Sequence, residues 1–227
     1  MSRMPCEEIR MPTPQSIEEL CVRAQALQGR MVCEVAQFLH VAIPKEPRRS
    51  KGFIGQLVER ILGSDPAAGD RPDFTGLGVE LKTIPVNTHG IPKESTFCCS
   101  IDMNTADTEK WETSRLRKRL ACVLWVPIES ALLAPMPARR FGVPVLWSPS
   151  LAQEACLRSD WEYLMGAIGA GYGGVLSARE GEALQVRPKA ANRLVRTVAP
   201  AQDGAMQTLP LGFYLRAVFT EKILKDT

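Results

Sequence analysis

The sequence of 227 residues has no apolar run that approaches the ~20 residues needed to cross a bilayer, so it predicts no membrane span. The first residues, Met1 to Glu8, lack the apolar centre of a secretion signal. The chain has seven cysteines, an odd number with no Cys-x-x-Cys pair, which argues against both a disulfide framework and a zinc site. Together these absences predict a protein of the reducing cytoplasm.

Histidines and nucleotide-binding loops are also scarce. Only two histidines, His40 and His89, are present, which disfavours any site built on a histidine cluster. There is no Gly-x-x-x-x-Gly-Lys-Ser/Thr loop, and the glycine-rich segment 169–174 follows a predicted helix rather than a strand. The chain is therefore not expected to hydrolyse a nucleotide. A net charge of +3 is too small to indicate a polyanionic partner, so the distribution of charge has to decide that question.

The remaining composition is that of a globular protein, with 45% hydrophobic and 23% charged residues. This length allows one large domain or two small ones. Residues 1–14 contain three prolines and no periodic pattern, which predicts a flexible N-terminal tail. Residues 15–227 are then expected to form a single domain.

Apolar spacing and breaker residues predict a mixed α/β (α+β) order of elements. Helices are expected between Ser16 and Gly29, around 32–39, and at 53–62, 150–168 and 217–225. Strands are expected around 79–83, at 95–101, at 121–126 with a stop at Pro127, and at 143–147, 175–178 and 184–189. The strands at 79–83 and 95–101 are predicted to begin a β-meander, and residues 209–215 to form an aromatic turn.

The stretch from Asp73 to Lys82 carries the clearest chemistry. Because strand side chains alternate, Glu80 and Lys82 should point to the same side, and Asp73 can approach them across a turn at Gly76 and Gly78. Two converging carboxylates favour a cation, and Mg²⁺ prefers such hard oxygen ligands. A lysine beside them can orient or deprotonate a water and stabilise charge on a phosphate. The pattern predicts hydrolysis of phosphodiesters.

The residues alone leave alternatives open. The Asp-x6-Glu-x-Lys spacing also suits a solvated strand face with one ordinary ion pair. Glu59 interrupts an otherwise apolar helix, so it is either a surface residue or a group that holds a second metal.

Basic residues are concentrated in segments that suit phosphate contacts. Residues 45–51 hold four cations in seven positions, just before the helix at 53–62. A second group consists of Arg115, Arg117, Lys118 and Arg119. Arg187 precedes Pro188, which restricts its backbone to an extended conformation.

Several segments, in order along almost the whole chain, resemble one family, the strand-directed mismatch-repair endonucleases called MutH. The matching segments are Lys51-Gly-Phe-Ile-Gly with Glu59, Asp73-Phe with Leu77–Pro85, Glu94–Phe97, Trp111–Ser114, Val123–Pro127, Leu146–Pro149, Arg187–Asn192, Leu209-Pro and Gly212–Leu215.

This resemblance implies a restriction-endonuclease-like PD-(D/E)xK fold, in which a mixed sheet is flanked by helices. Two lobes are expected around a DNA-binding cleft. It implies a monomeric, Mg²⁺-dependent enzyme that nicks the unmethylated strand at hemimethylated GATC sites in double-stranded DNA. A MutL-type ATPase is the expected activator.

The same resemblance implies roles for particular residues. Asp73, Glu80 and the Leu81 carbonyl would hold metal, Lys82 would attend the attacking water, and Glu59 would support the site, with a second metal as one option. The residues expected to contact DNA are Lys51, Phe97, Lys118, Arg119, Arg187, Pro188, Lys189 and Tyr214, with Arg187 and Pro188 in the base-reading loop and Tyr214 near the adenine methyl group.

One departure from the family is visible at Arg119, where the family has a catalytically important lysine. Arginine keeps the charge but changes the geometry. Two other functions remain open on the sequence, a restriction-type enzyme that cuts both strands and a DNA-binding module with an inactive metal site.

Overall fold

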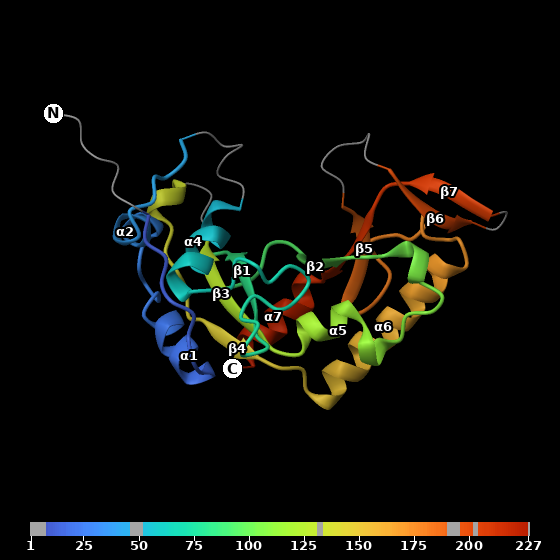
Figure 1. Cartoon of the computed structure of the whole chain (residues 1–227), viewed down its shortest axis with the longest axis horizontal. Coiled ribbons are helices and arrows are strands. Elements are labelled where there is room, and N and C mark those ends of the chain that lie inside the picture. Colours follow the sequence, from blue (N-terminus) through green and yellow to red (C-terminus); the bar gives the residue numbers. More distant parts are fainter. Residues whose placement is uncertain (1–7, 46–51, 131–133, 190–195, 202–203, 227) are drawn as a thin grey trace. The chain divides into compact units, whose positions relative to one another are not determined.

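The computed structural model of the chain describes residues 8–45, 52–130, 134–189, 196–201 and 204–226. The chain divides into two compact units, each built from separate stretches of sequence (Figure 1). The first unit contains the residues up to Lys93 together with Cys122–Trp147, and the second contains Glu94–Ala121 and the residues from Ser148 onward.

The sheet of the first unit has the order β1-β3-β4. Strand β1 (Glu80–Val86) runs parallel to β3 (Val123–Glu129), and β3 runs antiparallel to β4 (Val145–Trp147). The sheet is therefore mixed, as the family resemblance implied. Pro85 is tolerated because β1 is an edge strand, where a missing N–H breaks no ladder on the open side.

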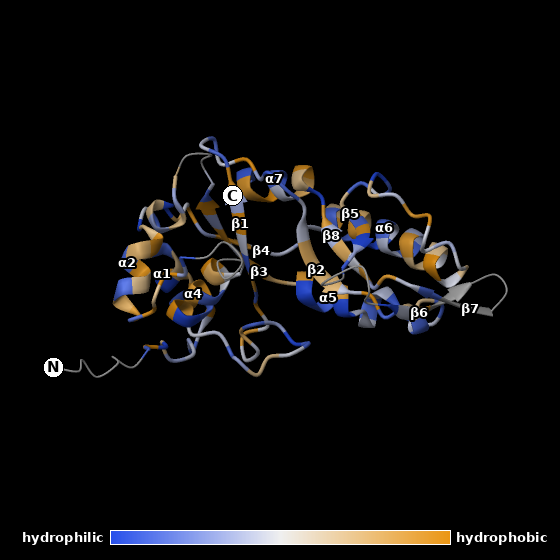
Figure 2. Cartoon of the chain, turned by 90° about the horizontal axis from the view of Figure 1, so that it is seen from above, coloured by the Kyte–Doolittle hydropathy of each residue, from blue (hydrophilic) through white to orange (hydrophobic). Residues whose placement is uncertain are grey.

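The helices of the first unit agree with their predicted positions. They are α1 (Ile17–Gln25), α2 (Val32–Phe38) and α4 (Phe53–Leu62), with the short η3 (Met136–Ala138) later in the chain. The Ser16 side chain accepts the Glu19 N–H and caps α1, as its position suggested. Orange and blue residues share each helix in Figure 2, which is the amphipathic pattern of helices whose apolar side faces a core.

Helix α4 lies close to β1. A Cβ added to Gly55 would stand 3.7 Å from the Thr83 hydroxyl oxygen, so the small residue lets the helix approach the strand. The apolar side of the helix, including Leu57 and Val58, is buried in the core of the unit. Helix α4 thereby acquires a fixed position beside the strand that carries Glu80 and Lys82.

The predicted β-meander is wrong. Strand β2 (Thr96–Ser100) does not pair with β1 but belongs to the sheet of the second unit. The partner of β1 is β3, and a parallel pair needs a long connection, which residues 87–122 provide. Pro127 also fails to end β3, because it lies beyond the three residues that pair with β4.

The sheet of the second unit has the order β2-β8-β5, with both pairings antiparallel. Its centre is β8 (Leu211–Leu215), a segment predicted as an aromatic turn, and its other edge is β5 (Leu184–Pro188), as predicted. The turn prediction fails because Pro210 and Gly212 suggested a break, whereas Phe213 and its apolar neighbours Leu211 and Leu215 are buried strand residues.

Helices and a hairpin complete the second unit. These elements are η1 (Met103–Thr105), η2 (Trp111–Thr113), α5 (Arg115–Leu120), α6 (Leu151–Gly169), β6 (Thr197–Ala201), β7 (Gly204–Thr208) and α7 (Ala217–Lys225). The helix predicted at 150–168 is confirmed as α6, which the Ser150 side chain caps and which buries five apolar residues. The strand predicted at 175–178 is wrong, since these residues form turns and irregular backbone.

Residues 8–14, part of the segment predicted as a flexible tail, make hydrogen bonds in the first unit. The Ile9 N–H donates to the Leu39 carbonyl, and the Met11 N–H donates to the Arg60 carbonyl at the end of α4. The Arg10 guanidinium donates to the carbonyl and hydroxyl of Ser64. The sequence could not predict these contacts, because the segment has no periodic structure of its own and its partners are distant in the chain.

Two further findings bear on the expectations from composition. The cysteines within the described residues are free thiols. In the same part of the chain, no helix combines the length and apolar character needed to pass through a bilayer.

The contact between the N-terminal segment and α4 can be tested at Gly63. Its φ is +77°, and an added Cβ would stand 2.7 Å from the Pro12 carbonyl carbon. We expect Gly63→Ala to lower the free energy of unfolding by roughly 1–2 kcal/mol for the left-handed backbone, and by roughly 1–3 kcal/mol more for overpacking. Urea denaturation measures the loss.

Gly69→Ala is the matched control. Gly69 also has a positive φ, +59°, but its added Cβ would meet nothing within 4 Å. It should show only the backbone cost. Equal losses in the two variants would contradict a close contact at Gly63.

Candidate functional site

A tight turn brings Asp73 to the start of β1. Phe74 and Val79 form an isolated antiparallel bridge, with the Phe74 N–H donating to the Val79 carbonyl at 2.9 Å. Gly78 supplies the left-handed residue of the turn with a φ of +68°. On the far side, the Leu81 N–H donates to the Asp73 Oδ2 atom at 2.8 Å. The turn predicted at Gly76 and Gly78 is therefore confirmed.

Glu80 and Lys82 form a buried ion pair. The Lys82 Nζ atom lies 2.5 Å from Glu80 Oε1, and the side chains are only 14% and 1% exposed. A charged pair shielded from water interacts more strongly than a surface pair, but it also loses hydration. Because Glu80 is buried, the alternative of a solvated strand face is wrong.

Glu59 lies on α4, and the charges of Asp73, Glu80 and Lys82 affect the pKa of its carboxyl group. Burial raises the pKa of its carboxyl group, and the negative charge of Asp73 raises it further. Arg10 and Lys82 act in the opposite direction. Glu59 is thus electrostatically coupled to the turn and to β1, which a surface glutamate would not be.

The oxygen donors here fit a divalent cation as a partial ligand set. Asp73 and Glu80 offer carboxylates, and Leu81 offers a strand carbonyl, all of them hard oxygen ligands. Among the described residues, no group of three or more His, Cys, Asp and Glu side chains is arranged to hold a metal by itself. Mg²⁺ tolerates this, because it is often held by one or two carboxylates and completed by waters and phosphate oxygens.

A second set of predicted residues meets on one face of the sheet in the second unit. Phe97 on β2 is the register partner of Tyr214 on β8, and their ring centroids are 5.3 Å apart in an edge-to-face arrangement. The Lys189 Nζ atom lies 4.1 Å from the Phe97 ring centroid, and the Arg187 guanidinium carbon lies 5.9 Å from the Tyr214 ring centroid. These distances are those of cation–π contacts.

Gly212 makes this aromatic face possible. A Cβ at Gly212 would stand 2.9 Å from the Phe97 ring and 3.2 Å from the Cys99 carbonyl oxygen. Arg187, Pro188 and Lys189 are exposed at the end of β5. We call Phe97, Arg187, Lys189, Gly212 and Tyr214 the aromatic face.

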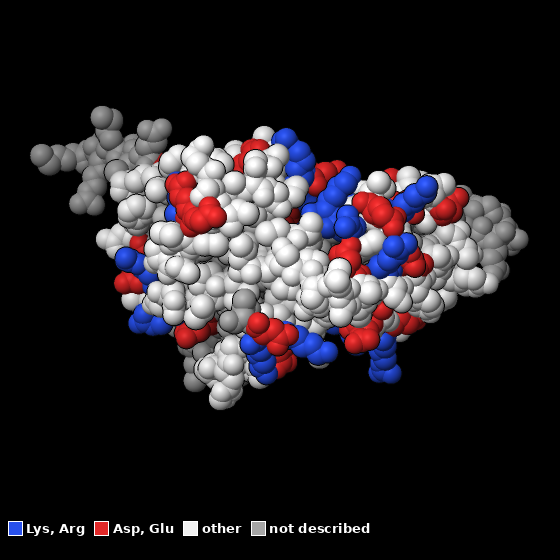
Figure 3. All heavy atoms as spheres, turned by 90° about the horizontal axis from the view of Figure 1, so that it is seen from below, with Lys and Arg blue, Asp and Glu red and all other residues white. Residues whose placement is uncertain are grey.

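The cations of α5 divide into different environments. Arg117 forms an ion pair with Glu154 at 2.6 Å, and the Trp111 ring N–H donates to the same carboxylate. Lys118 is exposed and Arg119 is half-buried. Charges of both signs are interspersed on the face that Figure 3 shows, so this face is not uniformly basic. The predicted run of four phosphate-contacting cations is therefore interrupted at Arg117.

Lys51, which was predicted to contact DNA, lies outside the described residues.

The sequence analysis did not identify three residues that make contacts near the predicted sites. Arg10 contacts Ser64 from the supposed tail, Asp65 contacts the loop that carries Asp73, and buried Gln185 accepts a hydrogen bond from Arg187 at 3.4 Å. Only Asp65 had a local signal, since an aspartate before a proline favours a turn.

Known proteins resemble this chain over most of its length. A family model described as "DNA mismatch repair enzyme MutH" matches residues 62–160. The DNA mismatch repair protein MutH of Vibrio parahaemolyticus is 45% identical over 214 residues, which cover 94% of this chain and 95% of the relative. The protein of the same name from Haemophilus influenzae strain PittGG is 43% identical over 93% of this chain and 95% of the relative, and that of Pasteurella multocida is 44% identical over 94% and 97%.

The chain belongs to the MutH family. Membership confirms the resemblance seen in the sequence, and the mixed α/β structure agrees with the restriction-endonuclease-like architecture expected for a MutH protein. The segment matched by the MutH model includes Asp73, Glu80, Lys82 and the cations of α5.

The raised pKa of Glu59, caused first by burial and then by the charge of Asp73, predicts a pH-dependent stability. The raised pKa means that the folded protein binds this proton more tightly than the unfolded chain, so stability falls as pH rises from the ordinary carboxyl value of 4.5 through the folded pKa. Glu59→Gln removes the charge at all pH values. We expect the variant to melt at a higher temperature than wild type at neutral pH without divalent cations, and the two to converge below pH 4.5. A difference in melting temperature that stays constant across this range would contradict a raised pKa of Glu59.

The two environments on α5 predict different roles in binding a polyanion. Lys118→Gln should weaken binding to any duplex and reduce the slope of log affinity against log salt by about 1, because an exposed phosphate contact is lost. Arg117→Gln is the matched control, since its guanidinium is already paired with Glu154. Fluorescence anisotropy over a salt series measures both slopes. A larger change for Arg117 than for Lys118 would reverse this assignment.

Proposed function

We propose that this MutH-family protein is a Mg²⁺-dependent endonuclease of DNA mismatch repair that nicks the unmethylated strand at hemimethylated GATC sites. The observation that carries the proposal is the arrangement of Asp73, Glu80 and Lys82 on one turn and one strand. A module that only bound DNA would gain nothing from convergent carboxylates beside an anionic backbone.

The residues of the first unit have separate tasks in this chemistry. Asp73, Glu80 and the Leu81 carbonyl would hold a divalent cation, which would supply positive charge for the phosphate and make a water easier to deprotonate. Lys82, fixed against Glu80, orients that water and stabilises negative charge on the phosphate oxygens. Glu59 supports the site from α4 and is the candidate for a second cation.

Arg187 and Tyr214 are the proposed readers of the DNA sequence. Adenine presents an N7 acceptor and an N6 donor in the major groove, and guanine presents N7 and O6 acceptors. An arginine matches the guanine pattern, so Arg187 reads guanine while Pro188 restricts its backbone. Tyr214 is half-buried against Phe97, and its ring is suited to detect the methyl group that N6 methylation adds.

The remaining predicted residues are proposed to contact the DNA backbone. Lys118, Lys189 and Arg119 supply cations from α5 and the end of β5, and Lys51 supplies one from outside the described residues. Such contacts position a protein without reading bases. Phe97 contributes by holding Tyr214 in its edge-to-face arrangement.

We further propose that the protein acts as a monomer in the cytoplasm and is activated by a MutL-type ATPase. One set of Asp73, Glu80 and Lys82 per chain suits a cut in a single strand. The sequence has no phosphate-binding loop of its own, so nucleotide hydrolysis would come from the partner.

The test uses a duplex with one GATC site, methylated on one strand, with a different label on each strand. Purified protein with Mg²⁺, with and without a MutL-type ATPase and ATP, should cut the unmethylated strand, and Asp73→Asn should cut neither. Loss of Asp73 should cost several orders of magnitude in rate, since such residues act as a unit. Tyr214→Ala should still prefer GATC but shift the ratio of unmethylated to hemimethylated cutting, because the contact with the methyl position is lost.

Each outcome separates the alternatives. Cutting of both strands would indicate a restriction-type enzyme. Binding without cutting by the wild type would indicate an inactive module. An unchanged ratio in folded Tyr214→Ala would make Tyr214 a packing residue only.

A further inference from the structure

The loop between α4 and β1 contains a carboxylate that is not part of the proposed ligand set. Asp65 follows the end of α4, and its Oδ1 atom accepts the Ala67 N–H at 2.8 Å. Its Oδ2 atom accepts the Thr75 hydroxyl at 3.1 Å and lies 3.8 Å from the Arg71 guanidinium. Both oxygens therefore face donors of the loop itself, which distinguishes Asp65 from a residue that offers its oxygens to a cation.

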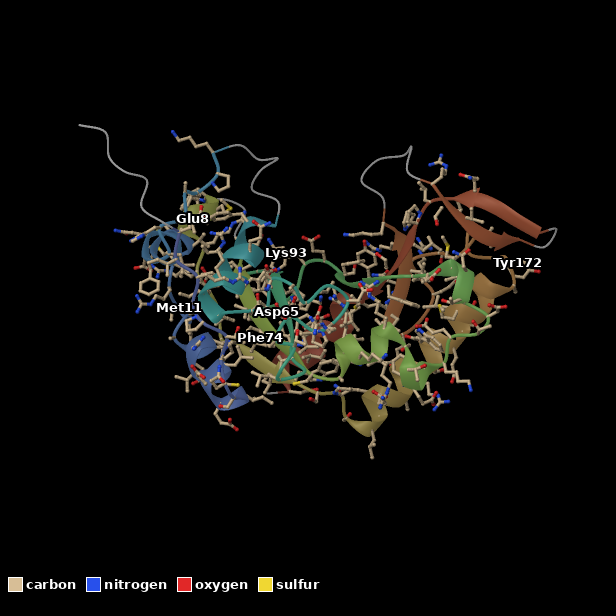
Figure 4. The ribbon with its side chains drawn as sticks, viewed as in Figure 1. Glu8, Met11, Asp65, Phe74, Lys93 and Tyr172 are labelled. Carbon is tan, nitrogen blue, oxygen red and sulfur yellow. The ribbon has the colours of Figure 1, made fainter. Side chains whose placement is uncertain are left out.

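Asp65 also holds the backbone of Asp73. The Asp65 N–H donates to the Asp73 carbonyl at 2.8 Å. The Thr75 hydroxyl lies 3.1 Å from Asp65 Oδ2 and 3.2 Å from the Pro72 carbonyl oxygen, so its single proton is shared between these two acceptors. Asp65 and Phe74, both labelled in Figure 4, belong to the two arms of this loop. The backbone around Asp73 is thus hydrogen-bonded at two carbonyl groups, that of Pro72 before it and its own.

The loop connects Asp73 to α4 as well. The Ser64 N–H donates to the Glu59 carbonyl at 2.9 Å, and Arg10 donates to both oxygens of Ser64. Consecutive residues, Ser64 and Asp65, therefore tie the helix that carries Glu59 to the residue that carries the first carboxylate. Movement of Asp65 would change the position of Asp73 relative to Glu80 and Lys82.

We propose that Asp65 is a positioning residue, which sets the place of the Asp73 carboxylate and thereby the affinity of the site for a divalent cation. The inference rests on the proposed function, because it requires Asp73 to be a ligand. Groups that orient metal ligands typically change metal affinity or activity by about 10–100-fold when they are removed.

The test measures binding of Mn²⁺ alone to the full-length, DNA-free protein by electron paramagnetic resonance. Asp65→Ala removes the side-chain contacts with Ala67, Thr75 and Arg71 but keeps the backbone hydrogen bond to Asp73, and we expect it to weaken Mn²⁺ binding by about 10-fold. Thr75→Val removes the hydroxyl that lies between Asp65 and Pro72, and it should also weaken Mn²⁺ binding. It is the milder variant, and it provides the test if Asp65→Ala does not fold. The double variant should lose less than the product of the two single effects, because the residues act through one contact.

Asp70→Ala is the control for charge. It removes one negative charge from an exposed position of the same loop and should leave Mn²⁺ affinity close to that of the wild type. Thermal unfolding without metal checks that each variant is folded. Wild-type Mn²⁺ affinity in folded Asp65→Ala or Thr75→Val, or an equal loss in Asp70→Ala, would overturn the inference.

Asp73→Asn separates this inference from the proposed function. If Asp73→Asn binds Mn²⁺ as well as the wild type, the ligand assignment fails, and the proposed function fails with it. If Asp73→Asn loses Mn²⁺ while Asp65→Ala and Thr75→Val keep it, only the positioning role fails.

Discussion

The position of Asp73 in the first unit is set by one hydrogen bond, which the Leu81 N–H donates to the Asp73 carboxylate. It joins the two arms of the Phe74–Val79 turn and places an acid at the start of β1. Hydrogen bonds to charged groups contribute about 1.5–3 kcal/mol, roughly twice the value of neutral ones. The bond therefore stabilises the turn while it holds one carboxylate near another. This turn and the edge strand that follows it consequently bring Asp73, Glu80 and Lys82 together.

The buried Glu80 explains why Lys82 has to be beside it. An unpaired buried carboxylate is costly, and removing one partner of a buried pair typically costs about 3–5 kcal/mol. The same residue that balances Glu80 in the fold is the one proposed to attend the attacking water. Burial and the charge of Asp73 raise the pKa of the Glu59 carboxyl group, and the charges of Arg10 and Lys82 offset this only in part. A cation bound near these groups would relieve that imbalance.

The connection between β1 and β3 explains how elements from the middle of the chain come to lie in the second unit. The parallel pairing of β1 with β3 requires a long connection, and this connection supplies β2 and α5 to the second unit. Phe97 thus reaches its register partner Tyr214 through β2-β8 pairing. Gly212 leaves room for the Phe97 ring, so the aromatic face depends on the absence of a side chain as much as on the rings.

The sequence by itself determined the helices, the turn at Gly76 and Gly78, the shared face of Glu80 and Lys82, and the family. Caps, turns and periodicity act over a few residues, so their physical causes can be found within a short window. Only the tertiary structure decided that β2 leaves the first sheet, that residues 209–215 contain a central strand, that Arg117 is paired with Glu154, and that Asp65 grips Asp73. These features depend on burial and pairing between residues far apart in the chain, and such contacts acquire their free energy only when the whole chain has folded.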